Sequence, residues 1–251
     1  MVPLKVLFGQ ESFRDGVDLD GDQFFDRLRQ ASKLPTTSAP SPGDFAAVYE
    51  RLAGDGEGVI SIHIGGQLSG TVEAARVGAQ AVEGLRVHVI DSRSTTMTIA
   101  FLCLVAAQSA SLAEAVQRVE ARIPKQRIIA LLDTLRYIEM GGRISRAQAM
   151  IGTMLDLKPV LGVADGEIKA LDRVRTRSRA IPRIIELLRD DYPLEHVAVM
   201  HAQAPEEAQR ILEEIGPELK RDGVDVATGQ IGAVLGTHTG PRALGFAYLK
   251  R

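Results

Sequence analysis

The chain has 251 residues, of which 45% are hydrophobic and 25% are charged, with a formal net charge of −2 and a pI of about 6.2. This length supports one large domain or two modest ones, and the charge balance excludes the basic surface of proteins that bind nucleic acid or anionic membranes. The single cysteine, Cys103, excludes an internal disulfide, and the longest apolar stretch, residues 99–107, is far shorter than the roughly 20 residues that span a bilayer, so we expect a soluble cytoplasmic protein.

Strand and helix patterns alternate through the first 156 residues. Ser41-Pro42-Gly43-Asp44 has the N-cap serine, the first-turn proline and the following acid of a helix start, and Ser111 with Glu114 stands in capping-box register. We expect strands at 2–8, 58–64, 86–91 and 126–132, and helices at 24–31, after 41, at 71–82 and twice before 126. This order predicts a three-layer α/β domain over residues 1–156 with a mainly parallel sheet.

The pattern changes after residue 156. Asp165-Gly166 is a hairpin turn signal between strand patterns at 158–163 and 167–172. The elements expected next are a helix at 178–189, a strand at 196–201, a helix from Pro205 to residue 220 and two final strands. The sequence therefore predicts a second, α+β domain with a mixed sheet over residues 157–251, with a cleft between the two domains.

Two loops follow predicted strands at the carboxyl edge of the sheet, where parallel sheets bind ligands. In residues 65–71, three glycines allow the backbone to approach an anion, and Ser69 and Thr71 stand near a helix N-terminus that favours negative charge. A tight turn in which Ser69 or Thr71 is the N-cap explains the same residues. Asp91-Ser92 ends the next strand at the same edge, and here too a helix cap is the alternative.

Three further segments carry groups that bind anions. Residues 36–41 concentrate four hydroxyls between two prolines, which indicates either an extended anion-binding segment or a capped loop. Arg143 follows a helix-stopping glycine pair, where it offers a fork for a carboxylate or phosphate, or is a solvated charge. The alternating arginines of residues 173–179 would share one face of an extended strand, which either docks an acidic partner or phosphate, or is a solvated edge.

His238 is surrounded by small or backbone-restricted residues from Gly236 to Pro241. Glycine and proline disfavour the interiors of helices and strands, so we expect a sharp loop with His238 at its apex. The histidine is then either functional or idle and exposed. The sequence contains no GxGxxG after a strand, no Walker loop, no GxSxG elbow and no HExxH pair.

Together, these segments resemble the DegV family, whose members bind a fatty acid. The matching segments follow the family's order over nearly the whole chain, at residues 34–41, 60–71, 89–92, 133–145, 158–160, 169–175 and 236–241. The resemblance implies two α/β domains with a long acyl chain buried between them. It also implies a non-catalytic carrier without a cofactor, which delivers its acid to a separate ATP-dependent fatty acid kinase subunit for phosphorylation of the carboxylate.

The resemblance further implies which residues surround the carboxylate. The expected carboxylate-binding residues are Thr37, Ser38, Gly65, Gly66, Arg143 and His238. The expected supporting residues are Ser69, Gly70, Thr71, Asp91, Ser92, Thr237 and Gly240. The expected partners are a long-chain fatty acid and the kinase subunit, without nucleic acid or a metal.

The chain departs from the family pattern in three places. The family begins with a further strand and helix ahead of the segment matching Val2-Pro3-Leu4, so a central strand of the first sheet is expected to be missing. Gly65-Gly66 stand where the family often has two serines, which leaves a backbone N–H in place of a hydroxyl. Arg242 replaces a usual glycine and adds bulk and charge beside His238.

Two other functions stay open from the sequence. A hydrolase or acyltransferase would use His238 as its general base, with Ser69 or Ser92 as the nucleophile. A degenerate homologue would fold with a partner and bind little.

Overall fold

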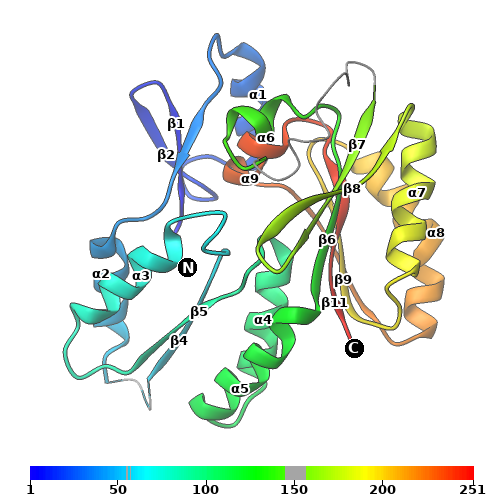
Figure 1. Ribbon diagram of the computed structural model, residues 1–251. Coiled ribbons are helices and arrows are strands. Elements are labelled where there is room, and N and C mark those ends of the chain that lie inside the picture. Colours follow the sequence, from blue (N-terminus) through cyan, green and yellow to red (C-terminus); the bar gives the residue numbers. More distant parts are fainter. Residues whose placement is uncertain (55, 57, 145–156) are drawn as a thin grey trace.

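The computed structural model describes residues 1–54, 56, 58–144 and 157–251. Its strands form three sheets, with helices on the faces of these sheets (Figure 1). In chain order the strands are β1 Lys5–Phe8, β2 Glu11–Arg14, β3 Thr36–Ser38, β4 Val59–His63, β5 Val87–Asp91, β6 Gln126–Leu131, β7 Lys158–Ala164, β8 Glu167–Val174, β9 Leu194–His201, β10 Asp225–Gln230 and β11 Leu244–Lys250. The helices are α1 Gly21–Gln30, α2 Pro42–Leu52, α3 Thr71–Gln80, α4 Met97–Ala107, α5 Leu112–Arg122, the 3-10 helix η1 Ile123–Lys125, α6 Arg136–Met140, α7 Arg177–Arg189, α8 Pro205–Arg221 and α9 Ala233–Thr239.

The largest sheet has the strand order β10-β9-β11-β6-β7-β8, in which β10 and β9 are parallel and the other neighbours are antiparallel. Successive side chains of each strand point to opposite sides of the sheet. Apolar side chains lie on both of these faces. Val197 and Val199 of β9 pack in a core with α7 and α8, whereas Ala198 and Met200 face the side of α4. Figure 1 shows α7 and α8 on one side of this sheet and α4 on the other.

The parallel pair β4–β5 forms a second, smaller unit. Phe45 and Tyr49 of α2 pack with Ala75 of α3 against one face of the pair, and Ile60 and Ile62 of β4 pack toward α4 and α5 on the other face. Among the residues that the structure describes, β4 pairs with β5 alone. This unit therefore carries the β4–α3 and β5–α4 loops to the edge that faces the large sheet (Figure 1).

The third sheet is antiparallel and has β1 at its centre, in the order β2-β1-β3. Val6 of β1 is buried in one cluster with Phe24 and Phe25 of α1 and with residues of α6 and α9. This packing sets β3 beside α9. It brings Thr37 into contact with His238, although the two residues are 201 positions apart.

Most local expectations from the sequence are confirmed. Ser41 caps α2 in a reciprocal capping box with Asp44, and Ser111 caps α5. Asp165 and Gly166 have φ angles of 53° and 81°, the mirror-image turn that joins two-residue hairpins. The α/β class, with a parallel and a mixed sheet, is confirmed as well.

The expectation of a loop around His238 was wrong. Helix α9 includes Gly236, because the missing side chain at this position leaves room for Phe24 and Phe25; a Cβ there would stand 2.8 and 2.9 Å from their rings. The sharp change of direction comes only at Gly240, where φ is 73°. His238 therefore lies in the last turn of a helix.

Two other placements differ from those expected. The arginine alternation does not continue along one strand, because β8 ends at Val174 and Arg177 begins α7, where it pairs with Glu207 and Asp133. Strand β6, expected in a mainly parallel first sheet, instead pairs antiparallel with β11 and β7. The large sheet thus combines strands from both sides of residue 156, the expected end of the first domain.

Candidate functional site

An apolar cavity lies between the inner face of the large sheet and the two smaller units. Its floor is formed by β6, β7, β9 and β11, and its walls by β3, the β4–α3 and β5–α4 loops, α6 and α9. Ile138 and Leu161 connect it to the hydrophobic cluster around α1 and α9, and Ile128 and Val163 connect it to the cluster beneath α4. The cavity therefore extends between two of the protein's hydrophobic cores.

Polar side chains line the cavity where β3, the β4–α3 loop and the ends of α6 and α9 meet. The polar lining residues are Thr37, Ser38, Ser69, Thr95, Thr96, Arg143, His238 and Thr239. Arg143 is the one residue with a fixed charge among the described lining residues, and no aspartate or glutamate is among them. An amphiphile with an apolar tail and an anionic head is the ligand that this distribution favours.

Thr37 and His238 form the central contact of the polar end. Thr37 Oγ1 and His238 Nε2 are 3.0 Å apart, and both side chains are partly buried. Asp15 fixes the start of α9, because its carboxylate accepts hydrogen bonds from the backbone N–H groups of Ala233 and Val234 at 2.8 and 3.1 Å. The cap therefore fixes the N-terminal end of α9, whereas His238 lies in the last turn of the same helix.

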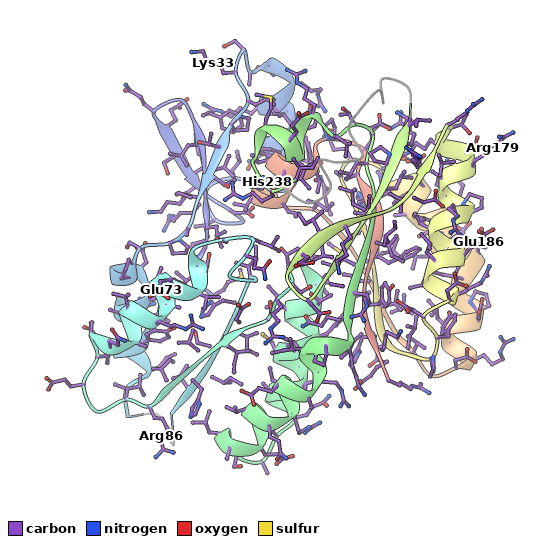
Figure 2. The ribbon with its side chains drawn as sticks, in the orientation of Figure 1. Lys33, Glu73, Arg86, Arg179, Glu186 and His238 are labelled. Carbon is purple, nitrogen blue, oxygen red and sulfur yellow. The ribbon has the colours of Figure 1, made fainter. Side chains whose placement is uncertain are left out.

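Two glycines allow α6 to approach the histidine. A Cβ at position 141 would stand 2.2 Å from His238 Nδ1, and one at position 240 would stand 2.2 Å from the ring of Tyr137. Because no Cβ atom tolerates such distances, Gly141 and Gly240 are required for the close contact between α6 and α9. His238 is consequently held between α6 and β3, and Figure 2 shows it beside the α6 and α9 ribbons.

His238 is neutral at physiological pH. Burial, with a smaller contribution from the positive charge of Arg143, lowers the pKa of His238 from 6.5 to about 4. Its Nδ1 is buried and has no hydrogen-bond partner among the residues that the structure describes. A buried N–H without an acceptor is costlier than a bare lone pair, so we assign the hydrogen to Nε2, which then donates to Thr37 Oγ1. In this tautomer the Thr37 hydroxyl keeps its own hydrogen for a ligand.

Arg143 bridges two walls of the polar end. Its Nε donates to the carbonyl of Leu68 at 3.3 Å in the β4–α3 loop, and its Nη1 donates to the carbonyl of Gly141. The guanidinium has five donors, so these two bonds leave others for a carboxylate. Ser145, which ends the matching sequence segment, lies outside the described residues.

The glycine loop lies differently from the sequence expectation. The N–H of Gly65 donates to the carbonyl of Ser94 at 2.8 Å, and that of Gly66 donates to Asp91 Oδ1 at 3.1 Å. Neither glycine is among the described residues that line the cavity, whereas Ser69 and Gly70 of the same loop line it. In this loop, Ser69 therefore offers the nearest hydroxyl to the cavity.

The other expected supporting residues act on loop and helix geometry. Thr71 bonds to Ser69 across 2.8 Å, and Asp91 also accepts from the N–H of Arg93 at 2.8 Å. The hydroxyl of Thr237 donates to the carbonyl of Ala233 at 2.9 Å within α9. These side chains hold the walls of the cavity.

Arg242 does not exert the charge effect on His238 that was expected from the sequence. Its guanidinium stands 3.8 Å from Glu207, and its φ of 60° is the left-handed conformation that favours glycine. Its charge does not contribute to the lowered pKa of His238. Arg242 thus holds a strained backbone conformation without changing the electrostatics of the histidine.

Sequence reasoning missed Thr95 and Thr96, which line the cavity from the β5–α4 loop. Thr96 has a φ of 56°, which is rare for a β-branched residue and marks a constrained loop. The hydroxyl run after Asp91-Ser92 was the available signal. Asp15 gave no local signal, because its partners are more than 200 positions away.

Of the two candidate nucleophiles, Ser69 and Ser92, neither pairs with His238 in the described part of the chain, and Ser69 bonds to Thr71 instead. His238 Nε2 contacts Thr37, and Ser92 is fully buried with its hydroxyl bonded to the carbonyl of Ser94 at 3.3 Å. Elsewhere, Ser61 and His63 form a pair 2.8 Å apart. Tyr49 of α2 also forms a hydrogen bond with Ser61, and both residues of the pair lie outside the described cavity lining. Burial lowers the pKa of His63 to about 4.

No group of three or more histidine, cysteine, aspartate or glutamate side chains is arranged to hold a metal ion within residues 1–54, 56, 58–144 and 157–251. In the same residues, no helix combines the length and the apolar character needed to cross a membrane.

Comparison with known proteins gives consistent matches. The chain matches the family described as "Uncharacterised protein, DegV family" over residues 1–251. It is 35% identical to the protein DegV of Bacillus subtilis, over 99% of this chain and 90% of the relative. The crystal structure of the Bacillus subtilis protein, described as a fatty acid binding protein, superposes with a TM-score of 0.90 and covers 100% of this chain and 91% of its own.

Two further solved structures share the fold. A DegV family protein from Thermus thermophilus, described by its fatty acid binding, is 30% identical with a TM-score of 0.89, over 99% of this chain and 90% of its own. The Streptococcus pneumoniae Fatty Acid Kinase B3 protein, solved with linoleic acid, has a TM-score of 0.84 over 99% of this chain and 90% of its own. At 20% identity the latter shows a common fold.

Proposed function

The chain belongs to the DegV family, and on this premise we propose that it is a non-catalytic carrier that binds one long-chain fatty acid in the cavity. The acyl tail lies on the floor of the large sheet. The carboxylate lies at the polar end, where the Thr37 hydroxyl, Arg143 and Ser69 supply donors. His238 orients the Thr37 hydroxyl and does not act as a base.

The observation that carries this proposal is the joining of an apolar cavity to a single cationic, donor-rich end. Each buried methylene contributes about 0.8 kcal/mol, so a tail of 14 to 18 carbons supplies most of the affinity. A carboxylate in apolar surroundings requires several donors. The neutral His238–Thr37 pair and the Arg143 guanidinium meet this requirement without a second buried charge.

The second part of the proposal concerns a partner. We infer that the loaded protein presents its carboxylate to an ATP-dependent fatty acid kinase subunit, which forms the acyl phosphate. The Streptococcus pneumoniae Fatty Acid Kinase B3 protein, which shares this fold, supports a link to a kinase. Arg143 supports presentation, since its side chain is exposed while it faces the cavity.

Denaturing mass spectrometry of an organic extract of the purified protein tests binding. We expect one co-purifying acid of 14 to 18 carbons; a clean extract, followed by failure to bind added palmitate, would contradict binding. Thr37→Val keeps the side-chain shape but removes the hydroxyl, so palmitate affinity should fall about 10- to 100-fold, as for the loss of about 1.5–3 kcal/mol. Thr37→Ser is the matched control and should retain binding.

Transfer is tested separately with a bacterial fatty acid kinase subunit, ATP and the palmitate-loaded protein. We expect acyl phosphate, trapped as the hydroxamate, and slower transfer with His238→Ala. If loaded protein never yields acyl phosphate, the carrier binds fatty acid but does not serve a kinase.

A further inference from the structure

On the β9–β11 part of the cavity floor, small residues surround one methionine. Met200 of β9 lies on the cavity face of the large sheet, with Ala198 two positions before it. Its cross-strand neighbours are both glycines, Gly229 on β10 and Gly245 on β11. The next residue of β11 on this face, Ala247, is also small. Met200 is thus a large flexible side chain whose cross-strand neighbours on both sides lack a side chain.

The methionine leans to one of the two sides. A Cβ at Gly229 would stand 3.5 Å from Met200 Cε and 3.7 Å from its Sδ, so the thioether lies over β10. Gly229 is outside the described cavity lining, whereas Gly245 belongs to it. The end of the Met200 side chain therefore lies toward the β10 edge of the cavity floor, and the space over Gly245 is part of the cavity.

The backbone requires glycine at position 245 but not at position 229. At Gly245 a Cβ would stand 2.0 Å from the carbonyl oxygen of Ile129, so the pairing of β11 with β6 requires glycine. At Gly229 a Cβ would make an ordinary van der Waals contact, and φ is not left-handed. Backbone geometry therefore does not require glycine at 229. A methyl group at 229 would only touch Met200, and a larger side chain would occupy the space of its thioether.

Methionine is suited to such a position. It has three rotatable bonds and no branch, so it changes rotamer readily and fills irregular gaps. With no Cβ on either neighbour, its end is free to move from above Gly229 to above Gly245 without displacing the backbone. Movement toward Gly245 shortens the cavity, and return to Gly229 lengthens it.

We propose that Met200 is the specificity-determining residue for the acyl tail, an adjustable wall that rests over Gly229 for long chains and moves over Gly245 to fill the space left by short ones. The inference rests on the proposed function. It assigns tail selection to a single side chain of the floor.

The test measures dissociation constants for saturated acids of 12, 14, 16 and 18 carbons. Met200→Ala deletes three heavy atoms, so we expect the preferred length to increase by about two carbons and the 12-carbon acid to bind several-fold more weakly. Each methylene that loses its contacts costs roughly fourfold in affinity. Met97→Ala is the control, because Met97 packs in the same cluster but lies outside the described cavity lining.

Gly229→Val tests the resting position directly. Valine fits the strand but occupies the space beneath the thioether, so we expect the 18-carbon acid to bind at least fourfold more weakly and the 12-carbon acid to bind as before. Met200→Ala in the same chain should restore binding of the 18-carbon acid, since nothing is left to be displaced. Gly229→Ala, whose Cβ only touches the thioether, is the matched control and should bind the 18-carbon acid like the wild type.

An unchanged preference in Met200→Ala, or a Gly229→Val effect that persists without Met200, would overturn the inference while leaving fatty acid binding intact. A wild-type protein that binds none of the four acids would instead overturn the proposed function, and the inference with it.

Discussion

The polar end and the sheet floor of the cavity differ in how firmly their side chains are held. At the polar end, Asp15 caps α9, Gly141 permits close packing, and the His238 ring is fixed against Thr37. On the floor, Met200 has a glycine as its neighbour on each adjoining strand. A carboxylate needs donors at fixed positions, whereas a hydrocarbon tail needs only apolar surface. Under the proposed function, one end recognises a chemical group and the other accommodates a shape.

The largest expected effect comes from the floor. Leu161→Ala removes a buried side chain that lines the cavity, and should lower the free energy of unfolding by about 2–4 kcal/mol. Affinities for palmitate and for its alcohol, hexadecanol, should fall in parallel, because only the tail is affected. Leu171→Ala, on the exposed face of the neighbouring strand, is the matched control for denaturant unfolding. If Leu161→Ala weakened the binding of palmitate but not of hexadecanol, the floor would also recognise the carboxylate, which would contradict the difference between the two ends.

At the polar end, the lowered pKa of His238 should make the free energy of unfolding depend on pH. The pKa of His238 is about 4 in the folded protein and near 6.5 in the unfolded chain, so the unfolded chain takes up the proton first as pH falls. The free energy of unfolding should therefore decrease between pH 6.5 and 4, on the order of 3 kcal/mol for this residue, and level off below pH 4.

His238→Asn should flatten this pH profile and weaken palmitate binding. His63→Asn is the informative control, because the pKa of His63 is also about 4 but the residue lies outside the described lining. It should flatten the profile in urea unfolding yet leave palmitate affinity unchanged. Equal effects of the two variants on binding would show that the His238 contact with Thr37 is not special.

Gly141→Ala tests how tightly the polar end is packed. Its Cβ would stand 2.2 Å from His238 Nδ1, so the ring must move, at a cost of about 1–3 kcal/mol in stability. Palmitate affinity should fall more than hexadecanol affinity. Gly216→Ala, where nothing lies within 4 Å, should be neutral or stabilising. Wild-type melting temperature and affinity for Gly141→Ala would refute the close contact of α6 with His238.

The smallest effect is expected at Arg242. Arg242→Gly relieves a left-handed φ of 60° and gives up an exposed contact with Glu207, so stability should rise by about 1 kcal/mol. Palmitate affinity should stay at the wild-type value, as measured by competition binding. A large change in palmitate affinity would show that Arg242 does act at the polar end of the cavity.

The sequence allowed the strands, the helix caps and the hairpin at Asp165-Gly166 to be predicted, because these depend on neighbouring residues. It also brought Thr37, Arg143 and His238 together, through the family resemblance. It failed where distant packing decides: α9 forms despite Gly236 because two phenylalanine rings need that space. The Gly65-Gly66 loop donates its N–H groups within the protein, through bonds that no local pattern encodes.

The most direct measurement compares palmitate with hexadecanol, which has the same tail and no charge, on the wild-type protein and on Thr37→Val. We expect the wild type to bind palmitate at least tenfold more tightly than hexadecanol, and Thr37→Val to lose most of this preference while binding hexadecanol almost unchanged. Equal affinities of the wild-type protein for the two ligands, or a preference that survives Thr37→Val, would contradict a carboxylate site at the Thr37–His238 pair.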